Sequence, residues 1–239
     1  MPRPLSQCRI PTKPTHGGRR LGAGRPKRSR FQSHVRRPRL SLHQPIHVTL
    51  KLQPGLPSLK KKELFRCLRA AVRTARKREF GVTHFAILSN HMHLILEPRQ
   101  SGVGRLFQSL CISFAKRLNK KLARTGAVFL DRYHIHVLKT PIEVRNALAY
   151  VLTNESRHRL RSKAILGKTR PITRATTFTV RLDPFSSAFR FEAWKPLFGS
   201  KVEFEFSGWT QDSMERWFDE ILVPAKTGLL RRGWMKSNG

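Results

Sequence analysis

The sequence predicts an α+β fold in which helices pack on an antiparallel sheet, and two patterns indicate it. Some segments alternate apolar and polar residues with the period of two that a half-buried strand requires, and others place apolar residues three and four apart, as on one face of a helix. Strand and helix patterns interleave along residues 45–158. Interleaved elements of this kind form one layered unit around one core.

Four segments have the strand pattern. In the first, apolar residues at the even positions alternate with His47, Thr49 and Lys51, which take the other face. The second and third are joined at Ser89-Asn90, which suits a tight hairpin, and the fourth is rich in branched and aromatic residues. The predicted strands are 46–52, 82–88, 91–97 and 128–138.

Three segments have the helical pattern. The third begins at Thr140-Pro141-Ile142-Glu143, which combines a Thr N-cap, Pro at the first helical position and Glu three residues after the cap. Cys67 and Cys111 fall among the apolar residues of the first two helices, so we interpret them as small hydrophobic side chains. The predicted helices are 58–79, 106–122 and 141–155.

The first six elements follow the order βαββαβ, which is that of a ferredoxin-like split βαβ sandwich, and the third helix is an addition to it. In this topology two helices cover one face of the antiparallel sheet and leave the other face open for a ligand. Function therefore depends on the side chains of the open face. We divide the chain into an arm (1–44), a catalytic domain (45–158) and a C-terminal extension of unknown role (159–239).

The net charge of +34, from 48 Lys and Arg against 14 Asp and Glu, indicates a polyanionic partner. Residues 1–44 hold 12 Lys and Arg and no acid, and they lack periodic apolar residues, so we expect a disordered basic arm. Contacts to DNA phosphates should make binding salt-dependent. The basic residues expected to contact the nucleic acid here are Arg25, Lys27, Arg28, Lys60, Lys61 and Lys62.

Composition also constrains the compartment. The three cysteines form no CxxC pair, which excludes a disulfide scaffold or a zinc ribbon and fits a reducing environment. No apolar run approaches the roughly 20 residues that a membrane span requires. We therefore expect a cytoplasmic protein with no membrane partner.

Two histidines, His91 and His93, share one face of the third predicted strand. The apolar residues that alternate with them would face the helices, which places both imidazoles on the open face, close enough to bind one metal ion. Imidazole suits Mn, Zn, Fe or Ni better than Mg. A second pair, His134 and His136, has the same spacing; we interpret it as surface residues that contact DNA, with metal ligation as the alternative.

The third predicted helix can complete this site. Its buried stripe consists of Val144, Leu148 and Val151, and Tyr150 and Asn154 lie along one border of that stripe. A helix packed on the open face would direct that border at the histidines. Tyr150 could then supply a nucleophilic phenol, and Asn154, one turn later, a third metal ligand through its amide oxygen.

The chain has only two tyrosines. Tyr133 lies within the fourth predicted strand next to Arg132, and we interpret it as a packing residue or as a platform on which a base stacks. Arg132 and Tyr133 are therefore counted among the candidate nucleic-acid contacts, and Tyr150 is the candidate nucleophile.

Three segments together, Ser89–His93, Val128–His134 and Ala149–Asn154, resemble in order and spacing the motifs of REP-associated tyrosine transposases, which are bacterial single-tyrosine HUH enzymes. The resemblance covers roughly residues 45–158. One departure is that the family usually has Pro after the Asn of the third motif, where this chain has Glu155. Further along, Ser186-Ser187 is similar to a Ser-Ser segment that follows the core in many members.

The resemblance implies specific roles. His91 and His93 would bind a divalent metal, Mg²⁺ or Mn²⁺, with Asn154 as the third ligand and Tyr150 as the nucleophile. The implied activity is metal-dependent nicking and rejoining of single-stranded DNA at hairpin-forming repeats, through a covalent 5′-phosphotyrosine. The implied partner is single-stranded or hairpin DNA in a bacterial nucleoid, and relatives with one tyrosine per chain suggest a homodimer.

The alternative is a non-catalytic RNA- or DNA-binding module with the same sheet. RNA-recognition sheets display aromatic residues on their central strands. The corresponding open-face positions of the third predicted strand are His91, His93 and Ile95. The sequence therefore favours the enzyme.

Overall fold

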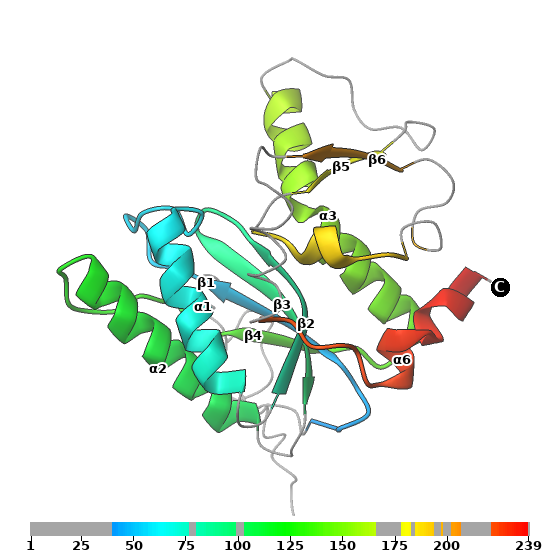
Figure 1. The fold of residues 1–239 in the computed structure, drawn as a ribbon, viewed down its shortest axis with the longest axis horizontal. Coiled ribbons are helices and arrows are strands. Elements are labelled where there is room, and N and C mark those ends of the chain that lie inside the picture. Colours follow the sequence, from blue (N-terminus) through cyan, green and yellow to red (C-terminus); the bar gives the residue numbers. More distant parts are fainter. Residues whose placement is uncertain are drawn as a thin grey trace, which may run out of the picture. The chain divides into compact units, whose positions relative to one another are not determined.

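The computed structural model describes residues 40–76, 80–98, 103–165, 178–182, 185–193, 197, 202–206 and 221–238 (Figure 1). The strands are β1 (Ile46–Lys51), β2 (Phe80–Ile87), β3 (His91–Pro98), β4 (His134–Val137), β5 (Phe178–Leu182) and β6 (Val202–Phe206). The α-helices are α1 (Lys62–Arg76), α2 (Val103–Lys121), α3 (Pro141–Ile165) and α6 (Gly228–Arg231), and the 3-10 helices are η1 (Ser187–Arg190) and η2 (Gly233–Asn238). The order from β1 to α3 is the predicted one. No helix within the described ranges is both long and apolar enough to cross a membrane.

Strands β1 to β4 form one antiparallel sheet with the order β2-β3-β1-β4, so the fold is α+β as predicted. Strand β1 pairs with β3 so that Thr49 lies opposite His93 and Lys51 opposite His91. Because directly paired residues point to the same face of a sheet, these four side chains share one face. Strands β5 and β6 form a separate parallel pair.

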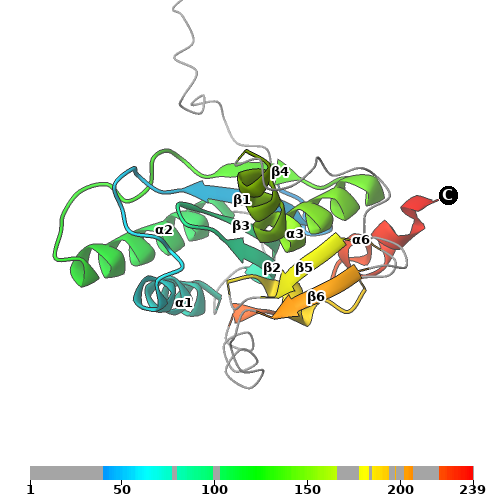
Figure 2. The same ribbon diagram turned by 90° about the horizontal axis from the view of Figure 1, so that it is seen from above.

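Different helices cover the two faces of this sheet (Figure 1, Figure 2). On one face, Met92, Leu94 and Leu96 of β3 belong to a core that also contains the apolar stripes of α1 and α2. This confirms the predicted orientation of β3. On the other face, Ala86 and Ile95 pack with the apolar stripe of α3, which includes Val144, Leu148 and Val151 as predicted. Full burial of a side chain of this kind stabilises the fold by roughly 1.5–3 kcal/mol.

The start of α3 is the predicted capping box. The Glu143 N–H donates to Thr140 Oγ1 at 3.2 Å, and the Thr140 N–H donates to Glu143 Oε2 at 2.9 Å. Two backbone donors that the helix leaves without partners are thereby satisfied. The cap fixes where α3 begins, and therefore which residues of the helix face the sheet.

The first helix begins at Lys62 and not at residue 58, and most other predicted bounds differ by one to three residues. The largest errors are in the third helix and the fourth strand. The helix predicted over 141–155 continues to Ile165, because no Pro or Gly interrupts it after Asn154 and Arg157 Nε donates to Thr153 Oγ1 at 2.9 Å across one turn. The strand predicted over 128–138 is reduced to β4. The side chain of Asp131 accepts a hydrogen bond from the Arg132 N–H at 2.7 Å. A backbone N–H bonded to a nearby side chain in this way is not used in strand pairing.

Cys67 and Cys111 are half-buried, and both pack against the core under α1 and α2. The prediction that they are small hydrophobic residues is confirmed.

Segments from the C-terminal third of the chain cover the outer edge of β2. The Phe85 N–H donates to Ser187 Oγ at 2.9 Å, which gives the Ser-Ser segment a structural role, and the Val223 N–H donates to the Val82 carbonyl at 2.8 Å. An edge strand leaves backbone groups without partners unless another segment pairs with them. The C-terminal segments satisfy part of this edge.

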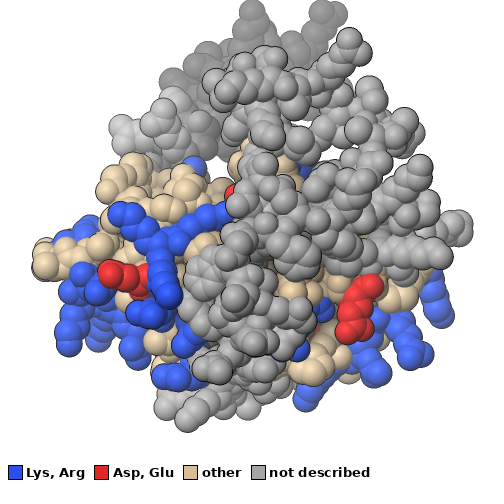
Figure 3. Space-filling model, turned by 45° about the horizontal axis from the view of Figure 1, so that its top comes forward, with Lys and Arg blue, Asp and Glu red and all other residues tan. Residues whose placement is uncertain are grey.

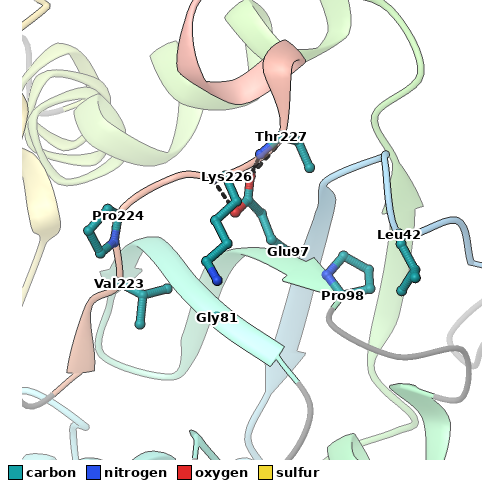
Figure 4. A pocket seen from close by; sticks show the side chains of 8 residues that line it. All are labelled: Leu42, Gly81, Glu97, Pro98, Val223, Pro224, Lys226 and Thr227. Carbon is teal, nitrogen blue, oxygen red and sulfur yellow. Dashed lines mark hydrogen bonds between the residues drawn. The ribbon is translucent and has the colours of Figure 1, made fainter.

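The buried carboxylate of Glu97 holds the last of these segments (Figure 4). It accepts hydrogen bonds from the Lys226 N–H at 2.7 Å, the Thr227 N–H at 2.8 Å and the Thr227 hydroxyl at 2.7 Å. Thr227 in turn caps α6, whose following residues bring Trp234 into the core under α3. The pocket beside Glu97 contains none of the candidate site residues.

Candidate active site

The face of the sheet under α3 is rich in histidine. The register of β4 with β1 places His136 opposite His47 and His134 opposite Thr49, and Thr49 is opposite His93 on its other side. Directly paired residues share a face, so the two His-x-His pairs lie on the same face, separated by strand β1. Polar side chains therefore line one face from β3 to β4, whereas the opposite face packs into an apolar core.

Helix α3 brings Tyr150 to this face. The Tyr150 ring centroid lies 5.0 Å from that of His93, in an edge-to-face arrangement, and 5.9 Å from that of His47. Although its ring contacts the histidines, Tyr150 is 39% exposed, so a substrate can reach its side chain. Asn154, one turn later, is only 2% exposed. The structure thus brings the predicted nucleophile close to the predicted histidine ligands, with Asn154 buried one turn further along α3.

His93 is the buried centre of the cluster. Its Nδ1 lies 3.0 Å from Thr49 Oγ1 and 3.2 Å from His47 Nε2, while its Nε2 is buried and has no hydrogen-bond partner among the described residues. When Nδ1 carries the proton and donates it to these neighbours, Nε2 keeps a lone pair. A buried polar atom without a partner costs roughly 1–3 kcal/mol, so its presence calls for an explanation.

A second such atom is the amide nitrogen of Asn154, which is also buried without a partner. The nitrogen and oxygen of an Asn amide exchange places when the group rotates by half a turn, so this position is equally one for an oxygen. An imidazole nitrogen and an amide oxygen are both atoms that a divalent metal ion accepts as ligands.

His91 completes the predicted ligand set. Its ring centroid is 5.0 Å from that of His93, and its Nδ1 lies 2.8 Å from Asn90 Oδ1. Because an amide oxygen only accepts, Nδ1 carries the proton and Nε2 is left with its lone pair. A hydrogen bond of this kind at one ring nitrogen is the usual way in which a ligating histidine is oriented.

The histidines are held in the neutral form that binds metal. Burial, followed by the neighbouring His47, His91 and His158, lowers the pKa of His93 to about 3. Burial, followed by His136 and His134, lowers the pKa of His47 to about 4. The pKa of His91 is lowered by burial first and then by His158 and Lys51. No protonation therefore competes with a metal at neutral pH.

His, Cys, Asp and Glu side chains alone do not complete a metal site. In the part of the chain that the structure describes, no three of them are grouped so as to hold an ion. Two imidazoles and one amide oxygen do fit a divalent ion in an open coordination sphere, with the remaining positions left for a phosphate and water. The donor types of His91, His93 and Asn154 therefore suit the predicted ion, and their joint role as ligands stays a prediction.

Three residues of the cluster were not predicted to act in it. His47 and Thr49 were placed on the correct face by the strand pattern, but their contact with His93 depends on the β1–β3 register. His158 lies eight residues after Tyr150, two turns along the same side of α3, and its ring centroid is 5.8 Å from that of His91. The four-residue spacing of Tyr150, Asn154 and His158 was the signal that could have revealed it.

The residues predicted to contact nucleic acid differ in their exposure and in their contacts. Lys61, Lys62 and Arg132 are exposed, whereas Lys60 lies 2.7 Å from Glu155 in an ion pair. The prediction that Tyr133 contacts nucleic acid is wrong, because Tyr133 is only 9% exposed and its ring packs on Phe107 with centroids 4.5 Å apart. Of the two interpretations of Tyr133, packing is right, since a ring in the core does not offer its face to a base. Arg25, Lys27 and Arg28 lie outside the described residues.

Comparisons with known proteins give one kind of match. No family model matches the chain, and no curated protein matches it. Among solved structures, that of a REP-associated tyrosine transposase bound to a REP hairpin is similar over 66% of this chain and 84% of that chain, with a TM-score of 0.47 and 18% sequence identity.

Proposed function

We propose that this protein is a metal-dependent tyrosine transposase that nicks and rejoins single-stranded DNA. The observation that carries the proposal is the contact of the Tyr150 ring with His93, whose buried Nε2 has no hydrogen-bond partner. A nucleophilic phenol, an imidazole nitrogen prepared for a metal and a second imidazole meet at one point of a strongly basic protein. We further assign the β2-β3-β1-β4 sheet to the ferredoxin-like arrangement that the sequence predicts.

The chain's own residues define the reaction. The Tyr150 oxygen attacks phosphorus and the bond from phosphorus to the 3′-oxygen breaks, so that the phenol loses a proton and the leaving 3′-oxygen gains one. The 5′-phosphate stays on the tyrosine, and attack by a later 3′-hydroxyl reverses the step and releases the phenol. A divalent ion bound by His91, His93 and Asn154 would polarise the phosphate and stabilise the leaving oxygen.

The proposed substrate is single-stranded DNA with a hairpin. The charge of +34 suits a polyanion, and on the face drawn in Figure 3 Lys and Arg cover more of the described surface than Asp and Glu do. The choice of single-stranded hairpin DNA follows the resemblance to REP-associated tyrosine transposases. The sheet gives no support to the alternative of an RNA-recognition module. Such modules display stacking aromatic residues on their central strands, whereas the face under α3 has His47, Thr49 and His93 on its central strands β1 and β3.

A covalent adduct tests the proposal. Incubation with hairpin-bearing single-stranded DNA and Mn²⁺ should give a protein–DNA species that resists denaturant, with the nucleotide on Tyr150 by peptide mass spectrometry. Tyr150→Phe removes only the hydroxyl, so binding should persist and the adduct should disappear. Tyr133→Phe is the matched control and should keep the adduct. An adduct that survives in Tyr150→Phe refutes the nucleophile, and free 5′-phosphate ends without an adduct indicate a hydrolytic nuclease instead.

A further inference from the structure

Lys60 is fixed to the hairpin that carries the histidines. The side chain of the preceding Leu59 is fully buried, and its N–H donates to the Ser89 carbonyl at 2.8 Å. Ser89 is in the turn between β2 and β3, two residues before His91. The backbone of Lys60 therefore follows any movement of the end of the sheet where the predicted metal ligands lie.

The side chain of Lys60 extends to the helix that carries the tyrosine. Its Nζ lies 2.7 Å from Glu155 Oε2, and the two side chains are only 24% and 23% exposed. The same ammonium lies 5.6 Å from the centroid of the Phe185 ring. An ion pair withdrawn from water to this degree is screened less than a surface pair, so the loss of one partner has a larger effect.

Helix α3 needs such a contact at this point. Among the side chains of α3 that the structure describes, the last one in the apolar core is Leu152, and the buried residues that follow it, Thr153, Asn154 and Ser156, are polar. Apolar packing therefore places the first half of the helix, and the ion pair of Glu155 is a polar contact directly beside Asn154 in the chain. Glu155 is the next residue along the chain and lies five residues after Tyr150.

We propose that the Lys60–Glu155 ion pair sets the distance between the tyrosine helix and the histidine hairpin, so that Lys60 is a positioning residue and not a phosphate contact. The pair joins the two elements that each supply half of the candidate site. Its effect on geometry is independent of the proposed function, whereas its effect on cleavage rests on that function.

The two roles of Lys60 predict opposite results. If Lys60 contacts a phosphate, Lys60→Met should weaken DNA binding, because the contact is lost. Glu155→Gln should then strengthen binding, because it removes a negative charge that repels the DNA. A positioning pair predicts that Lys60→Met and Glu155→Gln have the same effect, and that the double variant is little worse than either single one, because removal of one partner already breaks the contact.

The geometric test uses fluorine NMR, because the chain has only two tyrosines. Protein labelled with 3-fluorotyrosine should give two resonances, and Tyr150→Phe identifies the one from Tyr150. Lys60→Met and Glu155→Gln should each shift or broaden the Tyr150 resonance by more than its linewidth and leave that of Tyr133 unchanged. Lys121→Met and Glu63→Gln are the matched controls, since they break an exposed ion pair between α2 and α1. Unchanged Tyr150 resonances in both variants overturn the proposal, whether or not the protein cleaves DNA.

The kinetic test separates rate from affinity. Because a displacement of about 1 Å can cost about 100-fold in rate, Lys60→Met and Glu155→Gln should each slow adduct formation about 10- to 100-fold. Affinity for the hairpin DNA should change by less than about 3-fold in each variant. Weaker binding in Lys60→Met with an unchanged rate constant at saturating DNA overturns the proposal and restores the phosphate contact. Absence of adduct in the wild-type protein refutes the proposed function and leaves the fluorine result to decide the positioning role.

Discussion

The two faces of the four-stranded sheet are built from the same strands but differ in what they bury. Under α1 and α2 the core is almost entirely aliphatic and aromatic, with Phe65, Phe107 and Phe114 nearly or fully buried. Under α3 the apolar core is smaller, and the buried side chains also include His93 and Asn154, each with a polar atom that has no partner.

This difference separates stability from function within one sheet. Both faces bury apolar side chains that stabilise the fold, and among the described residues the buried polar atoms without a partner lie only on the α3 face. The α3 face departs from the full pairing of buried polar atoms where the imidazoles meet the tyrosine helix. Such departures are expected at functional sites, where the missing partner is a ligand.

The sharpest way to separate the two faces is to remove His93. His93→Ala should abolish adduct formation, whereas the free energy of unfolding should fall by about 1–3 kcal/mol, because the variant loses one neutral hydrogen bond and the packing of a buried ring but also one unsatisfied atom. Urea denaturation and the adduct assay measure the two effects.

Removal of metal should have the same effect on cleavage. In the wild-type protein, a chelator should stop cleavage and Mn²⁺ should restore it, but Mn²⁺ should not rescue His93→Ala. Undiminished cleavage in excess chelator would exclude a metal role for His91 and His93.

The converse change is on the other face. Phe65 is fully buried and packs against Phe85 and Phe185. Phe65→Ala should lower the free energy of unfolding by about 3–5 kcal/mol through lost burial and a cavity. At a temperature where the variant remains folded, its rate of adduct formation should stay close to that of the wild type. A rate loss as large as that of His93→Ala would show that the two faces are not separable.

A smaller effect is expected from the carboxylate that holds the C-terminal segment. Glu97→Gln replaces an acceptor of three hydrogen bonds by a neutral amide that accepts fewer of them, at a cost of about 1–3 kcal/mol. Hydrogen exchange should accelerate in residues 221–238, which include α6, and should not change in α1 and α2. Equal acceleration in all of these elements would mean that Glu97 supports the whole sheet and not one segment.

Acid should destabilise the α3 face through His84, whose ring packs edge-to-face on Phe191 with centroids 5.6 Å apart. Burial lowers the pKa of His84 to about 4 from its ordinary value of 6.5. Between these two values the unfolded chain binds a proton that the folded protein does not, so this contribution is fully present above pH 6.5 and is lost as the pH falls towards 4. Melting temperatures from pH 7.5 to 4.5 should fall less in His84→Gln than in the wild type. Parallel curves would contradict a role for this histidine.

Much of the framework follows from local pattern. The period of two in β1 and β3, the hairpin at Ser89-Asn90 and the capping box at Thr140 each act within a few residues, so the element order and the orientation of His91 and His93 could be predicted. The buried stripe of α3 was also readable, because Val144, Leu148 and Val151 recur at the spacing of a helix. The same local rules gave the bounds of α3 and β4 wrongly, since contacts with distant segments decide where an element ends.

By itself the sequence determined the βαββαβα order, the excess of positive charge and the residue types that a tyrosine enzyme would need, because propensity, periodicity and composition are properties of neighbouring residues. Which of these residues meet depends on long-range packing. The contact of His47 and Thr49 with His93 depends on the register of β1 and β3, and the ion pair of Lys60 with Glu155 joins residues 95 positions apart in the chain. The burial of Tyr133 is decided in the same way, because Phe107 lies on a different element. Contacts between distant segments arise from the packing of whole elements, which no single stretch of sequence encodes.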